Sequence, residues 1–462
     1  MAVEDALYGL DIIRARRPED LRFVDYLEGR QSQYLSMPAK FRQAWAEVID
    51  RHAVNMCRPV VFSKVNRLDV EAWEGDEAAN TLWNIEGASQ YQNEVYADAA
   101  TTGDGYMLVW PARTMDGPLK WHPLRSDEAV VVYSDDDPDI VDYGVKVWLV
   151  ESRGRARESR YRINVYYPDR VERYVTALIG TSGTGLVRDR SADINRIITD
   201  AQLIPYTEDG LDSVIPHNLP GVPLVHFRNN RGLDRRYGRS DLSDVLPLQD
   251  ALNMASLNAL VASEMYGLPL RVLLGFELTD DDGDGVPDNL PKPDPRADRF
   301  LAFPGTQTRV EQLSPADLTQ LVGIMGTYVS QIAAVAQRPS HVFLREGMSM
   351  PSGESLRVAE RPLIADVLTQ QQVFTPAWTE VMRLTGIEAT PMWADPNLVD
   401  MAEQWEIVRR KVDVGYPLRQ ALIDTGMESD VVDDILATSG TVGQLALQAF
   451  RNGDDPAAVV RG

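Results

Sequence analysis

Two long helical patterns on either side of an irregular insert constrain this chain more than any other feature. The first runs over residues 240–266 and is apolar or small almost all round after Pro247. The second opens at the capping-box pattern of residues 314–317, repeats apolar residues at three- and four-residue spacing, and stops at Arg338-Pro339. Helices that are apolar on more than one face need neighbours beyond their own chain. We therefore expect a helical hairpin that packs against further copies, because a head-to-tail interface can close into a ring.

The insert, residues 269–313, contains the sharpest local motif. Carboxylates at 280, 282, 284 and 288, with a glycine at 285, repeat the first part of a calcium loop, in which alternate oxygens converge on one hard cation. The twelfth position is Pro291 where a full loop has a bidentate Glu, so the motif matches only shorter calcium turns. A calcium site and a solvated acidic turn both stay open. The four carboxylates are Asp280, Asp282, Asp284 and Asp288.

Residues 103–176 change to a β pattern. Segments rich in β-branched and aromatic residues alternate with Asp, Gly and Pro turns, which predicts a meander of antiparallel strands. Helical patterns lie before and after this region, so we expect a mainly helical α+β fold. The predicted strands are 106–110, 129–133, 145–150 and 161–167.

Motifs for catalysis are scarce. The five histidines are far apart, and a structural role is the favoured interpretation of each. The glycine-rich segment 180–185 lacks the Lys-Ser/Thr of a phosphate loop, and Ser352 is interpreted as a helix cap. The single cysteine, Cys57, excludes an internal disulfide framework. We expect no enzyme and no required cofactor. The alternative from another class is a calcium-stabilised binding module or a metal-dependent enzyme centred on the acidic turn.

The charge balance argues against tight binding of nucleic acid. The chain has 46 Lys and Arg against 69 Asp and Glu, a formal net charge of −23, which repels DNA. An arginine cluster between Arg153 and Arg162 is expected to pair with acidic residues at 135–139, within the chain or between subunits, and a nucleic-acid patch is the less favoured alternative. No stretch approaches the ~18 apolar residues of a membrane span, so we expect a soluble chain with no membrane partner.

The order of a long helix, a β-containing insert, a return helix stopped by Pro, a loop and a kinked helix resembles the portal proteins of long-tailed (siphovirus-type) bacteriophages. The residues that carry the resemblance are 238–253, 338–341 and 351–360. It implies a dodecameric ring at one capsid vertex, through which DNA passes during packaging and ejection. The implied regions are a wing at 1–239, stem helices at 240–268 and 314–337, a clip at 269–313, a tunnel loop at 338–355, a kinked wing helix at 356–385, and a helical crown with a tail at 386–462.

The resemblance also implies partners. The clip would dock the terminase large subunit and later the head-to-tail adaptor, and the major capsid protein and scaffold would surround the ring. Double-stranded DNA would slide through without sequence-specific binding. The chain would reside in the virion, and in the host cytoplasm during assembly; another head-tail connector component is the alternative. The residues expected at the clip contacts are Asp280, Asp282, Asp284, Lys292, Arg296 and Arg299, and those expected in the tunnel loop are Arg345, Glu346, Met348 and Met350.

Overall fold

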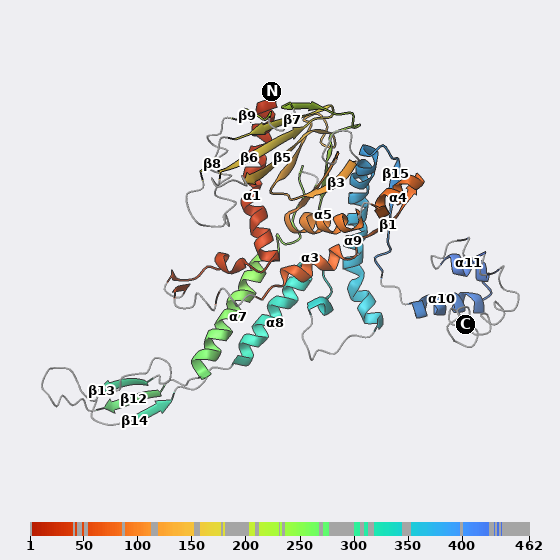
Figure 1. Cartoon of the computed structure of the whole chain (residues 1–462). Coiled ribbons are helices and arrows are strands. Elements are labelled where there is room, and N and C mark those ends of the chain that lie inside the picture. Colours follow the sequence, from red (N-terminus) through yellow and green to blue (C-terminus); the bar gives the residue numbers. More distant parts are fainter. Residues whose placement is uncertain are drawn as a thin grey trace. The chain divides into compact units, whose positions relative to one another are not determined.

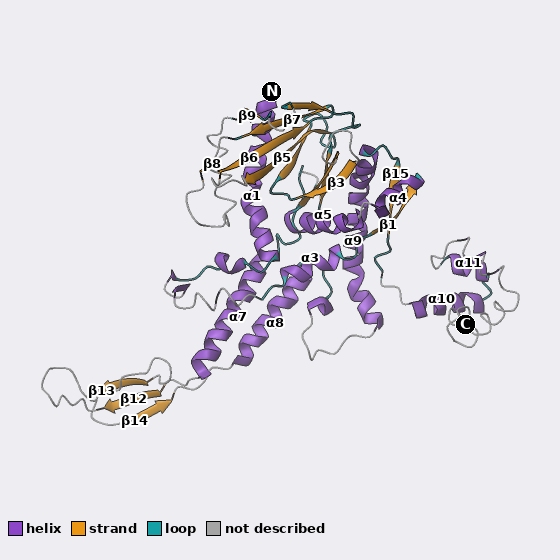
Figure 2. Cartoon of the chain, in the orientation of Figure 1, coloured by secondary structure: helices purple, strands orange, loops and turns teal. Residues whose placement is uncertain are grey.

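A computed structural model shows helices interleaved with mainly antiparallel sheets (Figures 1 and 2), which confirms the expected α+β class. The described residues are 2–39, 54–85, 88–111, 119–151, 158–176, 179–180, 203–207, 212–230, 232, 236–267, 271–276, 300–304, 309–312, 318–343, 353–397 and 401–424, with isolated positions at 42–43, 49, 429, 432–433 and 436.

The largest sheet contains the antiparallel meander that the sequence predicts. Consecutive strands β4 to β7 pair in chain order, and three short strands extend the sheet at β6 and β7. Val145 and Val147 alternate on β5 and are buried, as expected for a strand with one covered face. The strands are β4 (Ala129–Tyr133), β5 (Val141–Glu151), β6 (Glu158–Tyr166), β7 (Arg170–Val175), β8 (Ile179–Gly180), β9 (Ile204–Pro205) and β10 (Val214–Pro216).

Helix α1 (Ala2–Leu27) covers this sheet (Figure 1). Its buried residues Leu10 and Ile13 lie one turn apart and join the core formed with β4, β5 and β6. Gly9 permits the close approach, because a Cβ at that position would collide with the Val145 side chain. The short 3-10 helix η1 (Gln31–Tyr34) follows α1.

The structure differs from the predicted single meander at its first strand. β2 (Asp104–Pro111) pairs with β3 (Leu119–Leu124) and with β11 (Leu224–Arg228), in a separate three-stranded sheet of order β11-β2-β3. The strand itself was predicted correctly, but its sheet was not. Local patterning reports strand formation, whereas the partner β11 lies far along the chain and is selected by tertiary packing.

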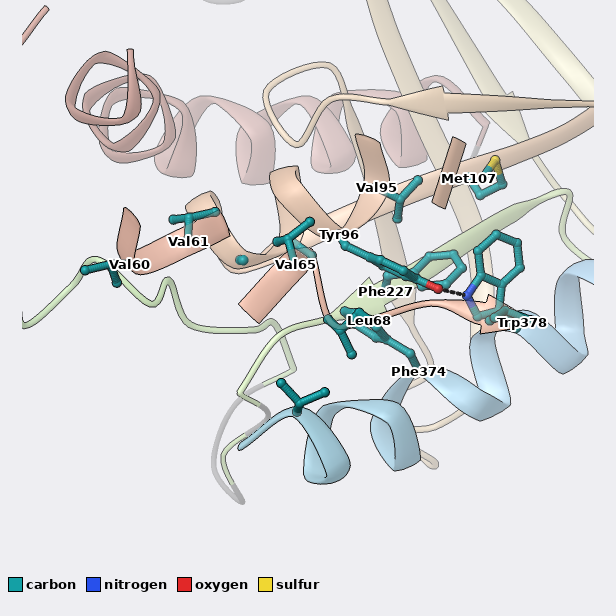
Figure 3. Close-up of a cluster of buried hydrophobic side chains, with 14 of the residues drawn as sticks. Val60, Val61, Val65, Leu68, Val95, Tyr96, Met107, Phe227, Phe374 and Trp378 are labelled. Carbon is teal, nitrogen blue, oxygen red and sulfur yellow. Dashed lines mark hydrogen bonds between the residues drawn. The ribbon is translucent and has the colours of Figure 1, made fainter. Parts of the chain in front are cut away.

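An aromatic core lies where this second sheet meets the long helix α9 (Figure 3). Trp378 is fully buried, and its indole N–H donates to the Tyr96 hydroxyl over 2.6 Å. Phe374 stacks on Tyr96 with ring centroids 5.1 Å apart, and Phe227 of β11 meets Trp378 edge-on. Such aromatic pairs stabilise a core by more than the burial of their apolar area alone. The helices that meet here are α3 (Cys57–Val65), α5 (Ala88–Thr102) and α9 (Gly353–Leu384).

The two predicted long helices are present and pack side by side (Figure 1). α8 (Leu318–Val335) falls within its predicted range, whereas α7 (Leu246–Gly267) starts later than predicted because residues 241–245 form turns. Ser240 Oγ accepts the Leu242 N–H over 3.0 Å and thus caps that turn. The insert contains a three-stranded sheet. Its central strand β12 (Arg271–Phe276) pairs parallel with β13 (Phe300–Pro304) and antiparallel with β14 (Arg309–Gln312).

After α8 the chain forms the 3-10 helix η3 (Ser340–Phe343) and then α9, which contains Pro362 and Pro376. The helix continues past Pro362. A two-stranded sheet then joins two distant parts of the chain. It consists of β1 (Val70–Gly75), which precedes α4 (Glu77–Ile85), and β15 (Ala389–Trp393).

The residues from Asp395 onward form a second compact unit. Its described helices α10 (Met401–Asp413) and α11 (Leu418–Ile423) enclose a small apolar cluster. The cluster residues are Val408, Ala421, Leu422 and Val432.

Candidate functional site

Helix α8 is uncharged in a strongly acidic chain. Residues 318–337 contain no Asp, Glu, Lys or Arg, although the chain has a net charge of −23. Large apolar side chains are nevertheless in solvent: Val322 is 53 % exposed, Ile324 46 % and Val335 48 %. An uncharged helix surface with exposed apolar side chains is typical of a protein-binding site.

Small residues line one face of this helix. Gly323, Gly326, Ser330 and Ala334 follow one another at three- and four-residue spacing, which places them on one face. A Cβ added at Gly323 or Gly326 would meet no atom of the described chain within 4 Å. Because the side chains at a contact set the distance between helix axes, this face allows another helix to approach closely.

The turn after α8 ends in Arg338, a buried residue whose guanidinium contacts three separate elements. Nε donates to the Val60 carbonyl of α3 over 3.0 Å. Nη1 donates to Asp366 Oδ2 of α9 over 2.8 Å, and Nη2 donates to Asp241 Oδ2 over 3.0 Å. Asp241 lies in the turns that lead into α7. The Arg338 side chain, at the end of the turn after α8, therefore contacts three other parts of the fold: the turns before α7, helix α3 and helix α9.

Lys64 of α3 completes the arrangement. Its fully buried Nζ lies 3.5 Å from Asp241 Oδ1 and 3.2 Å from Asp366 Oδ1. It also donates to Asn229 Oδ1 over 3.1 Å. Lys64, Asp241, Arg338 and Asp366 therefore form a closed cycle of two cations and two anions, which we call the charge hub. Its formal charges cancel.

The electrostatics of the charge hub keep Asp241 ionised. Burial opposes ionisation of Asp241, but Lys64 and Arg338 outweigh this effect and hold the pKa of its carboxyl below the ordinary value. Asn229 and Asn230 add hydrogen bonds to Asp241 Oδ1 over 2.9 and 2.6 Å. Buried ion pairs tolerate the loss of water only when their remaining polar atoms are satisfied, and the hub meets that condition.

A second ionic cluster is formed by residues that lie close in sequence to those of the charge hub. The buried carboxylate of Glu360 on α9 accepts a hydrogen bond from Arg67 Nη2 over 3.0 Å and lies 3.3 Å from His341 Nε2. His341 belongs to η3, and Arg67 lies in the turn that follows α3. The described residues on both sides of segment 344–352 are thus attached to the same part of the fold.

α8 and α9 enclose a groove of about 550 Å³ that shares Arg338 and Asp366 with the charge hub. Both charges are already matched, so the groove offers no free charge to a ligand. Two of its neighbours on α9 are exposed and apolar: Val358 is 56 % exposed and Leu368 44 %. The other lining residues are short or uncharged, namely Ala333, Ala334, Gln337, Ala359, Pro362, Ala365 and Thr369.

The site residues that the sequence predicts lie outside the described residues, so their roles stay predictions. They form the loop set Arg345, Glu346, Met348 and Met350 and the insert set Asp280, Asp282, Asp284, Asp288, Lys292, Arg296 and Arg299.

Sequence reasoning missed the charge hub. One signal for it was present, because Lys64 lies in α3 next to the buried Val65 and three residues after the buried Val61. A lysine on the buried face of a helix needs a partner of opposite charge. The pattern does not identify that partner, since Asp241 and Asp366 lie in distant parts of the chain.

Other predicted polar contacts can be compared with the structure. Asp135 pairs with Arg236 at 2.9 Å and Asp139 pairs with Arg228 at 3.4 Å. Arg153, Arg155 and Arg157 of the predicted cluster lie outside the described residues, so their pairing stays a prediction. The aspartates lie in the turn after β4. Arg228 is the last residue of β11, and Arg236 follows that strand. This pairing depends on the fold and is not visible in local sequence.

His226 has the structural role that the sequence favours for a histidine. It is buried, with Nε2 2.6 Å from Asp104 Oδ1 and Nδ1 2.7 Å from the Tyr133 hydroxyl. Burial lowers the pKa of His226, although the neighbouring Asp104 opposes this change. The contact joins β11, β2 and β4.

Within the described ranges, no three His, Cys, Asp or Glu side chains are grouped so that they could hold a metal ion. None of the described helices is long and apolar enough to span a bilayer.

Comparisons with known proteins agree on one family. The family model described as phage portal protein, SPP1 Gp6-like, matches residues 48–387. The portal protein of Mycobacterium phage D29 is 25 % identical over 364 residues, which cover 74 % of this chain and 68 % of that protein. The portal protein of Mycobacterium phage L5 is 26 % identical over 228 residues, or 46 % of this chain and 47 % of that protein.

Two solved structures of gene transfer agent particles are also similar. A chain from the virion of the native particle is 13 % identical with a TM-score of 0.44, covering 87 % of this chain and 94 % of that chain. A chain from the neck of the empty particle, computed with C6 symmetry, is 13 % identical with a TM-score of 0.46 and the same coverage.

Proposed function

This chain belongs to the SPP1 Gp6-like family of phage portal proteins, and we propose that copies of it assemble into a ring at one capsid vertex that conducts DNA. The family match includes α7, α8, the charge hub and all of α9. The observation that carries the ring is the uncharged, exposed surface of α8.

Like charges explain why α8 is the surface for assembly. Each copy has a net charge of −23, so most surfaces of two copies repel one another. Residues 318–337 bring no charge to a contact and offer Val322 and Ile324 for burial. Burying such side chains contributes about 25 cal/mol per Å² of apolar surface.

The charge hub supports this function by fixing the base of the hairpin. Asp241 at the entry to α7 and Arg338 after α8 meet in one buried network with Lys64 and Asp366. Residues held by packing and buried hydrogen bonds present a surface in a fixed geometry. A ring contact on α8 would therefore repeat in the same geometry in every copy.

The finer expectations from the family are part of the same proposal. The ring would be a dodecamer in the virion, docking the terminase large subunit and then the head-to-tail adaptor through residues 269–313, beside the capsid protein and scaffold. Residues 338–355 would face DNA, which passes without sequence-specific contacts. The family supports a structural role, and ATP hydrolysis would belong to the packaging partner.

A calcium site in the acidic turn of residues 280–288 is a separate proposal, supported by the spacing of its carboxylates. Titration of the purified protein with Ca²⁺ in a calorimeter tests it. Binding that is lost in the Asp282→Asn variant supports the site, and the absence of heat at millimolar Ca²⁺ overturns it.

Sedimentation of the purified chain tests ring formation. We expect a particle near twelve times 51.6 kDa, with a central channel in negatively stained images. Val322→Asp should raise the protein concentration needed for assembly at least tenfold, because assembly would then bury a charge on α8. The matched control Met392→Asp makes a comparable change at an exposed position of β15 and should leave assembly unchanged. A wild-type monomer at every concentration would overturn the proposal.

A further inference from the structure

We infer that the groove between α8 and α9 receives uncharged side chains from a second copy of this chain. The inference rests on the proposed assembly and adds α9 to its contact surface, which the exposed face of α8 alone does not include.

The charges around the groove restrict its occupant. Arg338 uses Nε, Nη1 and Nη2 for Val60, Asp366 and Asp241, so its guanidinium is matched within the fold. Asp366 is matched by Arg338 and Lys64. A phosphate or a charged peptide would lose its hydration without gaining a free counter-charge. The groove therefore favours an uncharged, largely apolar occupant.

The shape of the groove favours side chains from a packed helix or loop. Ala333 and Ala334 line it from α8, while Ala359 and Ala365 line it from α9. Because these lining side chains are short, the groove has a volume of about 550 Å³. This lies within the ~300–1,000 Å³ range of ligand pockets, which is large enough for several side chains. Filling it would remove apolar surface from water and restore close packing.

Continuity with α8 points to a second copy as the occupant. Ala334 belongs both to the groove and to the small-residue face that begins at Gly323 and passes through Gly326 and Ser330. A partner that lies along this face reaches the groove at the end of the same helix. Two copies can meet there despite their net charge of −23 each, because residues 318–337 contribute no charge and the charges of Arg338 and Asp366 are matched within the fold.

The exposed apolar side chains of α9 extend the same surface. Val358 directly precedes the groove residue Ala359, and Leu368 directly precedes the groove residue Thr369. Their side chains are 56 % and 44 % exposed. Exposed apolar side chains of this size beside a groove are typical of the edge of a protein interface.

Thiol protection in Ala365→Cys tests the inference directly. The natural Cys57 is fully buried, and burial raises its pKa to about 12, so it contributes little background labelling at pH 7.5. We expect a polyethylene glycol maleimide to label Cys at position 365 at least tenfold more slowly in the assembled fraction than in the monomer fraction. Thr81→Cys, an exposed position on α4, is the control and should be labelled equally in both.

Filling the groove provides a second measurement. Ala365→Phe should weaken assembly at least tenfold while the melting temperature of the monomer fraction changes by less than about 2 °C, since the added ring occupies open space. Equal labelling of position 365 in both fractions, or normal assembly of Ala365→Phe, overturns the inference.

The outcomes also separate the two proposals. If Val322→Asp blocks assembly while position 365 stays reactive in wild-type rings, the ring stands and the groove contact is wrong. A wild-type chain that never assembles overturns both. Protection of position 365 in monomers shows that the chain fills its own groove, which also contradicts the inference.

Discussion

Arg338 Nη1 donates a hydrogen bond to Asp366 Oδ2 over 2.8 Å, and this contact joins the end of α8 to α9. The same guanidinium binds Asp241 at the entry to α7. The two helices of the hairpin thus share one buried anchor, with side chains that are 2 % and 5 % exposed at Arg338 and Asp241. The exposed surface of α8 is therefore held in place by a largely buried set of contacts.

The first prediction concerns this anchor. Arg338→Met leaves Asp241 and Asp366 with only one of their two cations, Lys64, so we expect the free energy of unfolding to fall by about 3–5 kcal/mol in urea denaturation. The control Arg239→Met removes an exposed pair with Asp244 and should cost about 0–1 kcal/mol. Similar losses in the two variants would show that the charge hub is not a stabilising network.

The second prediction concerns the residue that ends α8. Gln337 has φ +53°, in the left-handed region, and the Arg338 N–H bonds to the Ala333 carbonyl over 2.9 Å, as in a glycine-terminated helix. Gln337→Gly should raise the free energy of unfolding by about 0.5–1 kcal/mol, because glycine adopts this conformation without strain. Gln331→Gly, within the helix, should lower it by a similar amount. Thermal unfolding that ranks the two variants in the opposite order contradicts this account.

The third prediction contrasts two glycines. A Cβ at Gly238 would collide with the Gly103 carbonyl, whereas one at Gly326 would meet no described atom within 4 Å. Gly238→Ala should therefore destabilise the chain by about 1–3 kcal/mol or more through backbone displacement. Gly326→Ala should stabilise the monomer fraction by about 0.5–1 kcal/mol, the ordinary gain in a helix. Chemical denaturation of both variants checks the sign of each change.

The fourth prediction is a pH dependence from Asp20 on α1. Burial raises the pKa of Asp20 to about 7, with Asp104 and Asp127 adding to this effect and Arg16 opposing it. Because the pKa in the folded state exceeds the unfolded value, ionisation of Asp20 destabilises the fold increasingly between about pH 4 and pH 7. Asp20→Asn should gain about 1–3 kcal/mol relative to wild type over that interval, with no further gain above it.

Urea denaturation at pH 4.5, 6 and 8 measures this pH dependence. Glu19→Gln, at the exposed neighbouring position, is the control and should shift stability by less than about 0.5 kcal/mol at each pH. A difference between Asp20→Asn and wild type that does not change with pH would exclude Asp20 as the cause.

Local patterns in the sequence predicted individual elements well. The strand predicted at 129–133 has those bounds in β4, and the helix predicted over 314–337 contains α8. Alternation of side chains and three- to four-residue spacing depend on neighbours in the chain, so they can be read without a fold. The sheet membership of β2 could not be predicted, since its partner β11 is distant in sequence.

The candidate site divides in the same way. The sequence by itself determined that two long apolar helices flank an insert, that the chain is strongly acidic, and which family it resembles. Only the tertiary structure decided that Lys64, Asp241, Arg338 and Asp366 meet, and that α8 and α9 enclose a groove lined in part by Arg338 and Asp366. Burial requires each charge to find a partner, but which partner it finds depends on how distant segments pack.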